Sequence, residues 1–149
     1  MTAYLPIVGL ETLHPRMPQP CANALAVAKS VQKHPKIAWV NYPGLEGDKY
    51  HDLAQKYMPK GTCGVVTFGV KGGRKAAETF MAGLKLASIA THVADAKTCG
   101  LHPASSTHRQ LSEAELAAAG VSADLIRLSV GIEDITDILA DLEQALDQV

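Results

Sequence analysis

The hydrophobic residues of this chain recur with two different periods, and the two periods alternate along the sequence. Apolar side chains that repeat every three or four residues predict helices over 21–33, 48–58, 74–88, 112–120 and 135–149. Short runs rich in β-branched residues, or with apolar side chains at every second position, predict strands over 36–44, 62–70, 89–94 and 124–134. We therefore expect about four strands interleaved with helices.

The predicted helix over 112–120 carries signals at both of its ends. Ser112 and Glu115 have the spacing of a capping box, in which each side chain bonds the backbone N–H of the other residue. Gly120 supplies the residue type that most readily ends a helix. This helix is the one whose boundaries the sequence defines best.

The first twenty residues do not continue the helical pattern that follows them. Three prolines fall within six residues, and an interior proline removes a backbone hydrogen bond and clashes with the preceding turn. We therefore predict that residues 1–20 form a kinked connector and that 21–149 form the domain proper. The prolines are Pro15, Pro18 and Pro20.

Each predicted strand has one apolar face and one mixed face, and this pattern constrains the fold. A strand buried on both faces would be apolar at nearly every position. The chain is therefore expected to form an α+β domain, with a mainly antiparallel sheet of about four strands and helices packed on one face. The second face of the sheet is left free to bind another group.

Arg127 interrupts the apolar run over 124–134. Because side chains alternate along a strand, Ile126, Leu128, Val130 and Ile132 share one face, and Leu125, Arg127, Ser129 and Gly131 share the other. A guanidinium in a sheet needs a counter-ion. Its planar fork suits a carboxylate or a phosphate, and the small Ser129 and Gly131 leave room for a ligand. The alternative is an internal ion pair with Glu133 or Asp95.

Composition and charge exclude several classes of protein. The 149 residues are 47% hydrophobic and 19% charged, with a formal net charge of -1, which is typical of a globular protein. No basic stripe indicates a nucleic-acid partner. No segment has the pattern of a secretion signal or the length of a membrane span, so we expect no membrane association and a cytoplasmic location.

The cysteines, at 21, 63 and 99, are odd in number and form no CxxC pair, which favours three free thiols and no metal site.

Two further stretches resemble reactive motifs without meeting their requirements. Gly72 and Gly73 follow a predicted strand, but the spacing of a phosphate-binding loop is absent. The segment 102–108 brings two histidines close to Ser105 and Cys99, and a small hydrolase built on Cys99 and His102 is the least favoured hypothesis. We expect a strand-to-helix turn at the glycines and a polar loop at 102–108.

Several stretches together resemble the C-terminal domain of the Cys/Met-metabolism family of pyridoxal-phosphate enzymes. They are "GLETLH", "ALAVAKSVQKHPKIAWVNYPGLE", "GVVTFGVKGGRKAAETFMAGLKLASIATHVADAKT", "LHPASSTHRQLSEAELAAAGV" and "DLIRLSVGIEDITDILADLEQAL". The resemblance covers about residues 9–148. Within the family, these stretches are most similar to the O-acetylhomoserine sulfhydrylases, also called homocysteine synthases. It implies the small C-terminal domain of a fold-type I enzyme, packed beside a large domain that holds the cofactor.

The resemblance also implies roles for particular residues. Arg127 would bind the α-carboxylate of the amino-acid substrate, and Thr107 would lie in the loop beside the pocket. His92 stands where the family usually has an Asn or Ser that assists in binding the carboxylate, and Ala94 replaces a glycine, so this sequence departs from the family at both positions. No lysine here matches the family's cofactor lysine, which lies upstream of the segments quoted above.

These implications lead to one principal hypothesis and one alternative. The first is a C-terminal domain or fragment of a pyridoxal-phosphate-dependent O-acetylhomoserine sulfhydrylase, which replaces acetate by sulfide at the γ-carbon. Alone, the chain is expected to be inactive and to bind no cofactor covalently. The alternative is a free-standing module that binds a small carboxylate or interacts with a partner. An amino-acid carboxylate is the expected ligand, and a cofactor-binding domain or a second copy is the expected protein partner.

Overall fold

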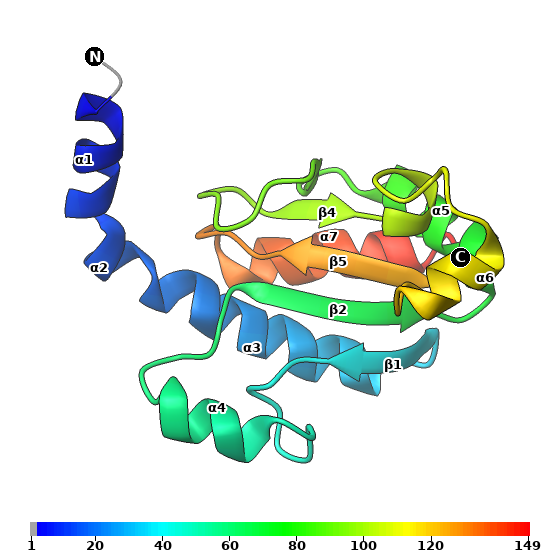
Figure 1. Ribbon diagram of the computed structural model, residues 1–149, viewed down its shortest axis with the longest axis horizontal. Helices are drawn as coiled ribbons and strands as arrows, with labels where there is room; N and C mark the ends of the chain where they lie inside the picture. Colours follow the sequence, from blue (N-terminus) through cyan, green and yellow to red (C-terminus); the bar gives the residue numbers. More distant parts are fainter. Residues whose placement is uncertain (1–2) are drawn as a thin grey trace.

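The computed structural model describes residues 3–149, and its centre is one mixed sheet of five strands (Figure 1). The strands are β1 (Ile37–Asn41), β2 (Val65–Val70), β3 (Ser88–Ile89), β4 (Cys99–Leu101) and β5 (Leu125–Ser129). They are arranged in the order β1-β2-β5-β4-β3, and every neighbouring pair is antiparallel except β3 with β4. The predicted α+β class with a mainly antiparallel sheet is therefore confirmed.

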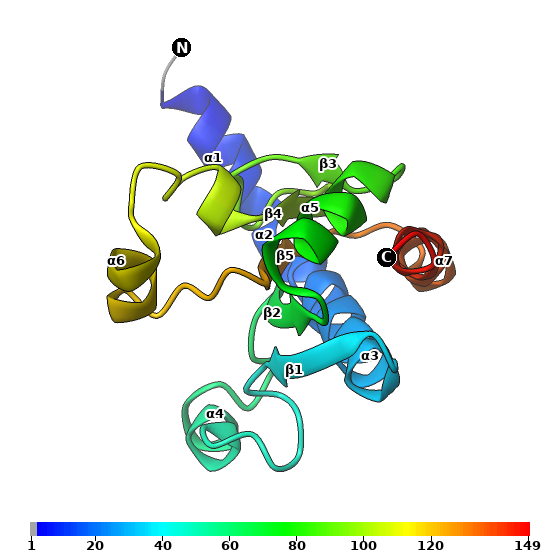
Figure 2. The ribbon, with the colours of Figure 1, turned by 90° about the vertical axis from the view of Figure 1, so that its right-hand side faces the viewer.

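The principal helices pack on one face of this sheet (Figure 2). α3 contacts β1 and β2, α5 contacts β2 and β5, and α7 contacts both of these helices. Among residues 3–149, no helix is both long and apolar enough to cross a membrane. The helical elements are α1 (Tyr4–Glu11), α2 (Leu13–Arg16), α3 (Pro18–Lys33), α4 (His51–Tyr57), α5 (Gly73–Gly83), the 3-10 turn η1 (Pro103–Ser105), α6 (Glu113–Ala118) and α7 (Ile135–Leu146).

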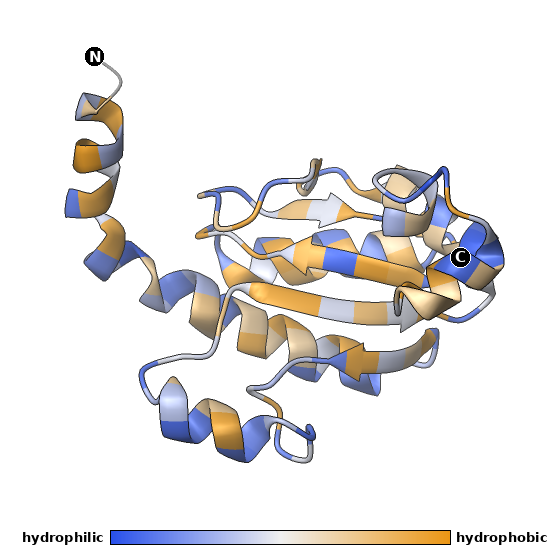
Figure 3. Cartoon of the chain, in the orientation of Figure 1, coloured by the Kyte–Doolittle hydropathy of each residue, from blue (hydrophilic) through white to orange (hydrophobic). Residues whose placement is uncertain are grey.

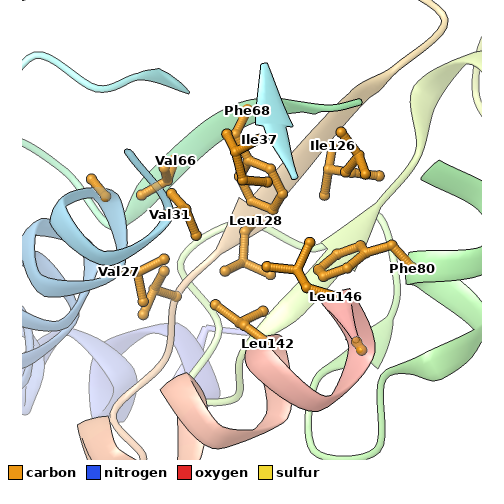
Figure 4. Close-up of a cluster of buried hydrophobic side chains, with 14 of the residues drawn as sticks. Val27, Val31, Ile37, Val66, Phe68, Phe80, Ile126, Leu128, Leu142 and Leu146 are labelled. Carbon is orange, nitrogen blue, oxygen red and sulfur yellow. The ribbon is translucent and has the colours of Figure 1, made fainter. Parts of the chain in front are cut away.

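The core lies between the sheet and these three helices (Figure 4). Alternate residues of β2 and β5 point into it, as the period of two predicts, and Ile126 and Leu128 have no exposed surface. Phe68 of β2 meets Phe80 of α5 edge to face, with 5.7 Å between the ring centres. The predicted amphipathic stripes of α5 and α7 thus cover the apolar face of the two central strands.

The predicted strands agree with the structure except around β3 and β4. The strand expected over 89–94 is reduced to Ser88–Ile89, and the following residues form a loop. β4 was not predicted, because Cys99–Leu101 is too short to show a periodic pattern. Ile132 was assigned to the buried face, but it is 44% exposed because β5 ends at Ser129.

The segment predicted to be a kinked connector is helical from Tyr4 onward. α1, α2 and α3 follow one another with single-residue interruptions at Thr12 and Met17. Pro18 and Pro20 lie in the first turn of α3, where the missing N–H would have no partner in any case. The predicted boundary at residue 20 falls inside α3, so helical structure runs through it.

Two helices expose apolar side chains that no described residue covers. α1 extends away from the sheet, and its exposed residues include Tyr4, Leu5 and Ile7 (Figure 3). In α4 the expected apolar face is formed, yet only Ala54 is buried while Leu53 remains exposed. Exposed apolar faces of this kind are typical of surfaces that bind another protein.

Candidate functional site

Arg127 occupies the middle of β5, the central strand of the sheet. Its neighbours across the sheet are Thr67 of β2 and Leu101 of β4. The side chain is half-buried and belongs to the face opposite α3, α5 and α7. The predicted alternation of faces along 125–130 is thus confirmed.

The guanidinium of Arg127 is anchored by the loop that follows β3. Its Nη2 atom donates to the carbonyl oxygen of Thr91 at 2.8 Å and to that of His92 at 3.3 Å. Its Nε atom is buried and has no hydrogen-bond partner among residues 3–149. One edge of the guanidinium is therefore held by backbone, and another donor has no acceptor within the described chain.

No carboxylate of residues 3–149 forms an ion pair with Arg127. The side chain of Glu133 accepts from the backbone N–H of Thr98 at 2.6 Å and from its hydroxyl at 2.9 Å. Asp95 instead contacts His92 at 3.1 Å and accepts from the N–H of Lys97 at 3.2 Å. The alternative of an internal ion pair with Glu133 or Asp95 is therefore wrong.

The space that the sequence predicted beside the arginine is filled by the chain itself. A side chain at Gly131 would collide with the backbone of Ala96 and Lys97, the latter at 2.6 Å. Ser129 is buried, and its hydroxyl accepts from the N–H of Ala94 at 3.1 Å. The prediction that Ser129 and Gly131 leave room for a ligand is wrong, because this end of the face is packed against the loop.

The loop over 91–97 is shaped by the same contacts. Ala94 has a φ of 60°, a left-handed conformation that costs an alanine about 1 kcal/mol and a glycine almost nothing. The side chain of His92 is 66% exposed and meets Asp95, so only the His92 backbone touches Arg127. The bond from the Lys97 N–H, and then the bond from His92, lower the pKa of the Asp95 carboxyl.

The polar segment 102–108 has a structural role. His102 is buried, with Nδ1 2.8 Å from the Ser105 hydroxyl and Nε2 2.9 Å from the Ala123 carbonyl oxygen. Because a carbonyl only accepts, Nε2 carries the proton and Nδ1 accepts from Ser105. Both nitrogens are engaged, so His102 is not available as a base for Cys99, whose pKa burial raises. Thr107 is exposed and bonds only its neighbour His108 among the described residues.

An apolar cavity of about 670 Å³ lies beside the loop over 91–97 and was not predicted from the sequence. Val93, Ala94 and Val130 line one side of it, and residues from α1 to α3 line another. The signal was present, because the lining residues of the first three helices recur at helical spacing, but the prolines among them argued against a helix. These residues include Leu10, Leu13, Met17 and Cys21.

The sequence is similar to enzymes of sulfur amino-acid metabolism. It is 49% identical over 148 residues to an O-acetyl-L-homoserine sulfhydrylase of Leptospira meyeri, covering 99% of this chain and 34% of the relative. It is 50% identical over 144 residues to a homocysteine synthase of Schizosaccharomyces pombe, covering 97% and 34%. An L-methionine gamma-lyase of Fusobacterium nucleatum is 44% identical over 147 residues, with coverage of 99% and 37%.

The fold is also that of a solved structure from Campylobacter jejuni, assigned as an O-acetylhomoserine (thiol)-lyase and containing N'-pyridoxyl-lysine-5'-monophosphate. The two agree with a TM-score of 0.91 at 40% identity, over 97% of this chain and 34% of the other. This chain thus spans about a third of the length of these relatives. The sequence profile of the Cys/Met metabolism PLP-dependent enzymes matches residues 1–147, and the chain belongs to that family.

Proposed function

We propose that this chain forms the substrate-carboxylate wall of an O-acetylhomoserine sulfhydrylase, with Arg127 as the residue that binds the α-carboxylate. The observation that carries the proposal is a guanidinium in the central strand that no carboxylate of residues 3–149 neutralises. An arginine that is half-buried without a counter-ion is suited to a negatively charged ligand. Relatives named O-acetyl-L-homoserine sulfhydrylase and homocysteine synthase supply the substrate class.

The anchoring of Arg127 determines how it would act on a substrate. The Thr91 and His92 carbonyls hold Nη2, which fixes the plane of the guanidinium before any ligand arrives. The remaining donors can then form charge-assisted hydrogen bonds with a carboxylate, and these are about twice as strong as neutral ones. Such a fixed orientation would place the α-carbon of the substrate, which the chemistry requires.

The residues of this chain do not fit the task of holding pyridoxal phosphate. The family's chemistry uses a lysine that forms a Schiff base with the cofactor in a pocket. No lysine among residues 3–149 is buried. The half-buried Lys36 donates through Nζ to the carbonyl oxygens of Leu146 at 2.9 Å and Asp147 at 3.3 Å. In this proposal the cofactor is therefore held by a separate cofactor domain, and the chain alone makes no homocysteine.

The exposed apolar helices are consistent with contact with such a domain. α1 and α4 present Leu5, Ile7 and Leu53 to solvent, and the cavity of about 670 Å³ is lined mostly by apolar groups. Burying apolar surface contributes about 25 cal/mol per Å², which favours a partner on these helices. We propose the cofactor domain of the same kind of enzyme as that partner, with self-association when the domain is missing.

Calorimetric titration of the 149-residue chain with O-acetylhomoserine tests the role of Arg127. We expect binding in the millimolar range or tighter that falls at least tenfold in Arg127→Ala. Arg127→Lys should recover only part of it, because an ammonium lacks the planar fork. Arg109→Ala, an exposed arginine, is the matched control and should bind like the wild type.

Two results would contradict the proposal. Equal binding by the wild type and Arg127→Ala would remove the arginine from the site. Homocysteine formation by the chain alone, from O-acetylhomoserine after addition of sulfide and pyridoxal phosphate, would show that a separate cofactor domain is not required. Carboxylate binding without turnover supports the proposed role, and it is also what the alternative of a free-standing binding module requires.

A further inference from the structure

Three metal-binding atoms converge at the start of β4, on groups that the proposed function does not use. A ring nitrogen of His92, an oxygen of the Asp95 carboxylate and Cys99 Sγ all lie within 4.8 Å of one another. The first two residues are in the loop after β3, and Cys99 is the first residue of β4. His92 and Asp95 are accessible, while Cys99 is buried beneath them.

The chemistry of these donors selects a narrow class of ion. An imidazole nitrogen, a carboxylate oxygen and a thiolate sulfur are the ligands of Zn²⁺ and of similar divalent transition metals. Around a tetrahedral zinc the ligand atoms are separated by about 3.2–3.7 Å, given metal–ligand distances of about 2.0–2.3 Å. His92 Nδ1 and Asp95 Oδ2 are already 3.1 Å apart.

The segment that carries the donors is held in place at several points. Arg127 fixes the carbonyl of His92, Ser129 accepts from the N–H of Ala94, and the N–H of Lys97 donates to Asp95 Oδ1. Cys99 is fixed by its pairing with Ser129 in the sheet. The loop is already ordered before a metal ion binds. Metal binding therefore carries only a small cost in conformational entropy.

The surrounding charges permit a cation at this position. The charges that act on Cys99 are those of Asp95 and Glu133, which are negative, and those of Arg127 and Lys97, which are positive. These four balance, so the thiolate that a metal ion requires leaves a net negative charge around the ion. A divalent cation coordinated by the thiolate is stabilised by this negative charge.

We infer that His92, Asp95 and Cys99 bind a Zn²⁺-class divalent ion through three protein ligands, with the fourth coordination position facing solvent. The site uses the side chain of His92, whereas the anchoring of Arg127 uses only its backbone carbonyl. The two functions therefore rest on different atoms of His92, and the metal site can be removed through side chains that the carboxylate site does not use. Three protein ligands with an open position is the arrangement of zinc sites that can bind a further ligand.

Titration of the reduced 149-residue chain with Co²⁺ tests the inference, because cobalt bound to a thiolate shows a charge-transfer absorption. We expect one equivalent of Co²⁺ to produce this band and one equivalent of Zn²⁺ to abolish it. Cys99→Ser should remove the band, and His92→Asn should weaken Co²⁺ binding at least tenfold. The matched control is the double variant Cys21→Ser/Cys63→Ser, which should keep the band, since those thiols lie elsewhere and line the apolar cavity.

Three outcomes would overturn the inference. They are the absence of a band in the wild type, a band that survives Cys99→Ser, and equal affinity in His92→Asn. His92 is exposed, so its substitution reports on the metal without the risk that the chain fails to fold. Carboxylate binding should persist in Cys99→Ser, because the proposed function does not use that thiol. Measuring both ligands in this variant separates failure of this inference from failure of the proposed function.

Discussion

The two faces of β5 are sealed in different ways. Ile126 and Leu128 are completely buried by the helical layer, and their packing partners are apolar side chains. On the opposite face Ser129 is buried by hydrogen bonding to the loop, while Arg127 is only half-buried. The helices cover their face of the strand completely, so no side chain there can reach a ligand. The loop covers only one end of the other face, and the guanidinium of Arg127 keeps a donor without a partner among residues 3–149. The same strand therefore serves stability on one side, and on the other it carries the guanidinium that we propose binds a carboxylate.

The largest expected effect comes from deleting apolar volume on the helical side. Leu128→Ala should lower the free energy of unfolding by about 2–5 kcal/mol, because it leaves a cavity among rigidly packed neighbours. Leu125 lies on the opposite face of the same strand and is half-buried. The loss in the free energy of unfolding for Leu125→Ala should be less than about half of that for Leu128→Ala. Urea unfolding of both variants measures the difference. Equal losses would show that the two faces are equally well packed.

An intermediate effect is expected where the loop seals the second face. Gly131→Ala should lower the free energy of unfolding by about 1–3 kcal/mol, because its Cβ would displace the backbone of Ala96 and Lys97. Hydrogen exchange of the Ile132 N–H should accelerate, since that group donates to the Ala96 carbonyl at 2.9 Å. Gly9→Ala is the control, because a side chain there would contact no atom within 4 Å. An unchanged Ile132 exchange rate in Gly131→Ala would contradict the role given to the loop.

The smallest effect concerns the start of α7, which belongs to the helical layer. Two bonds lower the pKa of the Asp134 carboxyl, first from the Thr136 hydroxyl and then from the Thr136 N–H. A carboxyl with a lowered pKa in the folded state stabilises fully above its ordinary pKa of 3.8, and this stabilisation is lost as the pH falls through the lowered value. Asp134→Ser keeps a cap that does not titrate.

Urea midpoints for the wild type and Asp134→Ser, compared at pH 7 and at pH 3, measure this contribution. The wild type should lose slightly more stability on acidification than the variant does. Identical changes in the two proteins would show that the carboxylate contributes nothing to the cap. Because the group is at the surface, its effect should also decrease at high salt.

The regular elements of the fold were accessible from the sequence because their patterns are long enough to be periodic. α6 has the predicted capping box, with Ser112 and Glu115 bonded to each other's backbone, and Gly120 ends it with a φ of 73°. β4 was missed because three residues cannot display a period. The helices at the start of the chain were missed because proline was weighed as a helix breaker, although Pro18 lies where a helix begins.

The candidate site was predictable only in part. The face of Arg127 followed from the period of two, since alternation is local to the strand. Its hydrogen bonds to Thr91 and His92 span more than thirty residues of sequence, and no pattern encodes them. The packing of Ala96 against Gly131 is equally non-local. From the sequence alone, the missing side chain of Gly131 was therefore interpreted as space for a ligand, whereas the backbone of the loop over 91–97 occupies that space.

The order of the strands has a consequence for how the protein acquires its structure. β5 is the last of the described strands along the chain, yet it lies between β2 and β4 in the sheet and joins the two halves. During synthesis from the N-terminus, β1 and β2 can form a hairpin early, but the sheet stays in two parts until Leu125–Ser129 has emerged. Pairing over such sequence separations is slow, and the open edge of β2 is exposed meanwhile. The strand that carries the guanidinium is therefore also the one whose arrival completes the sheet.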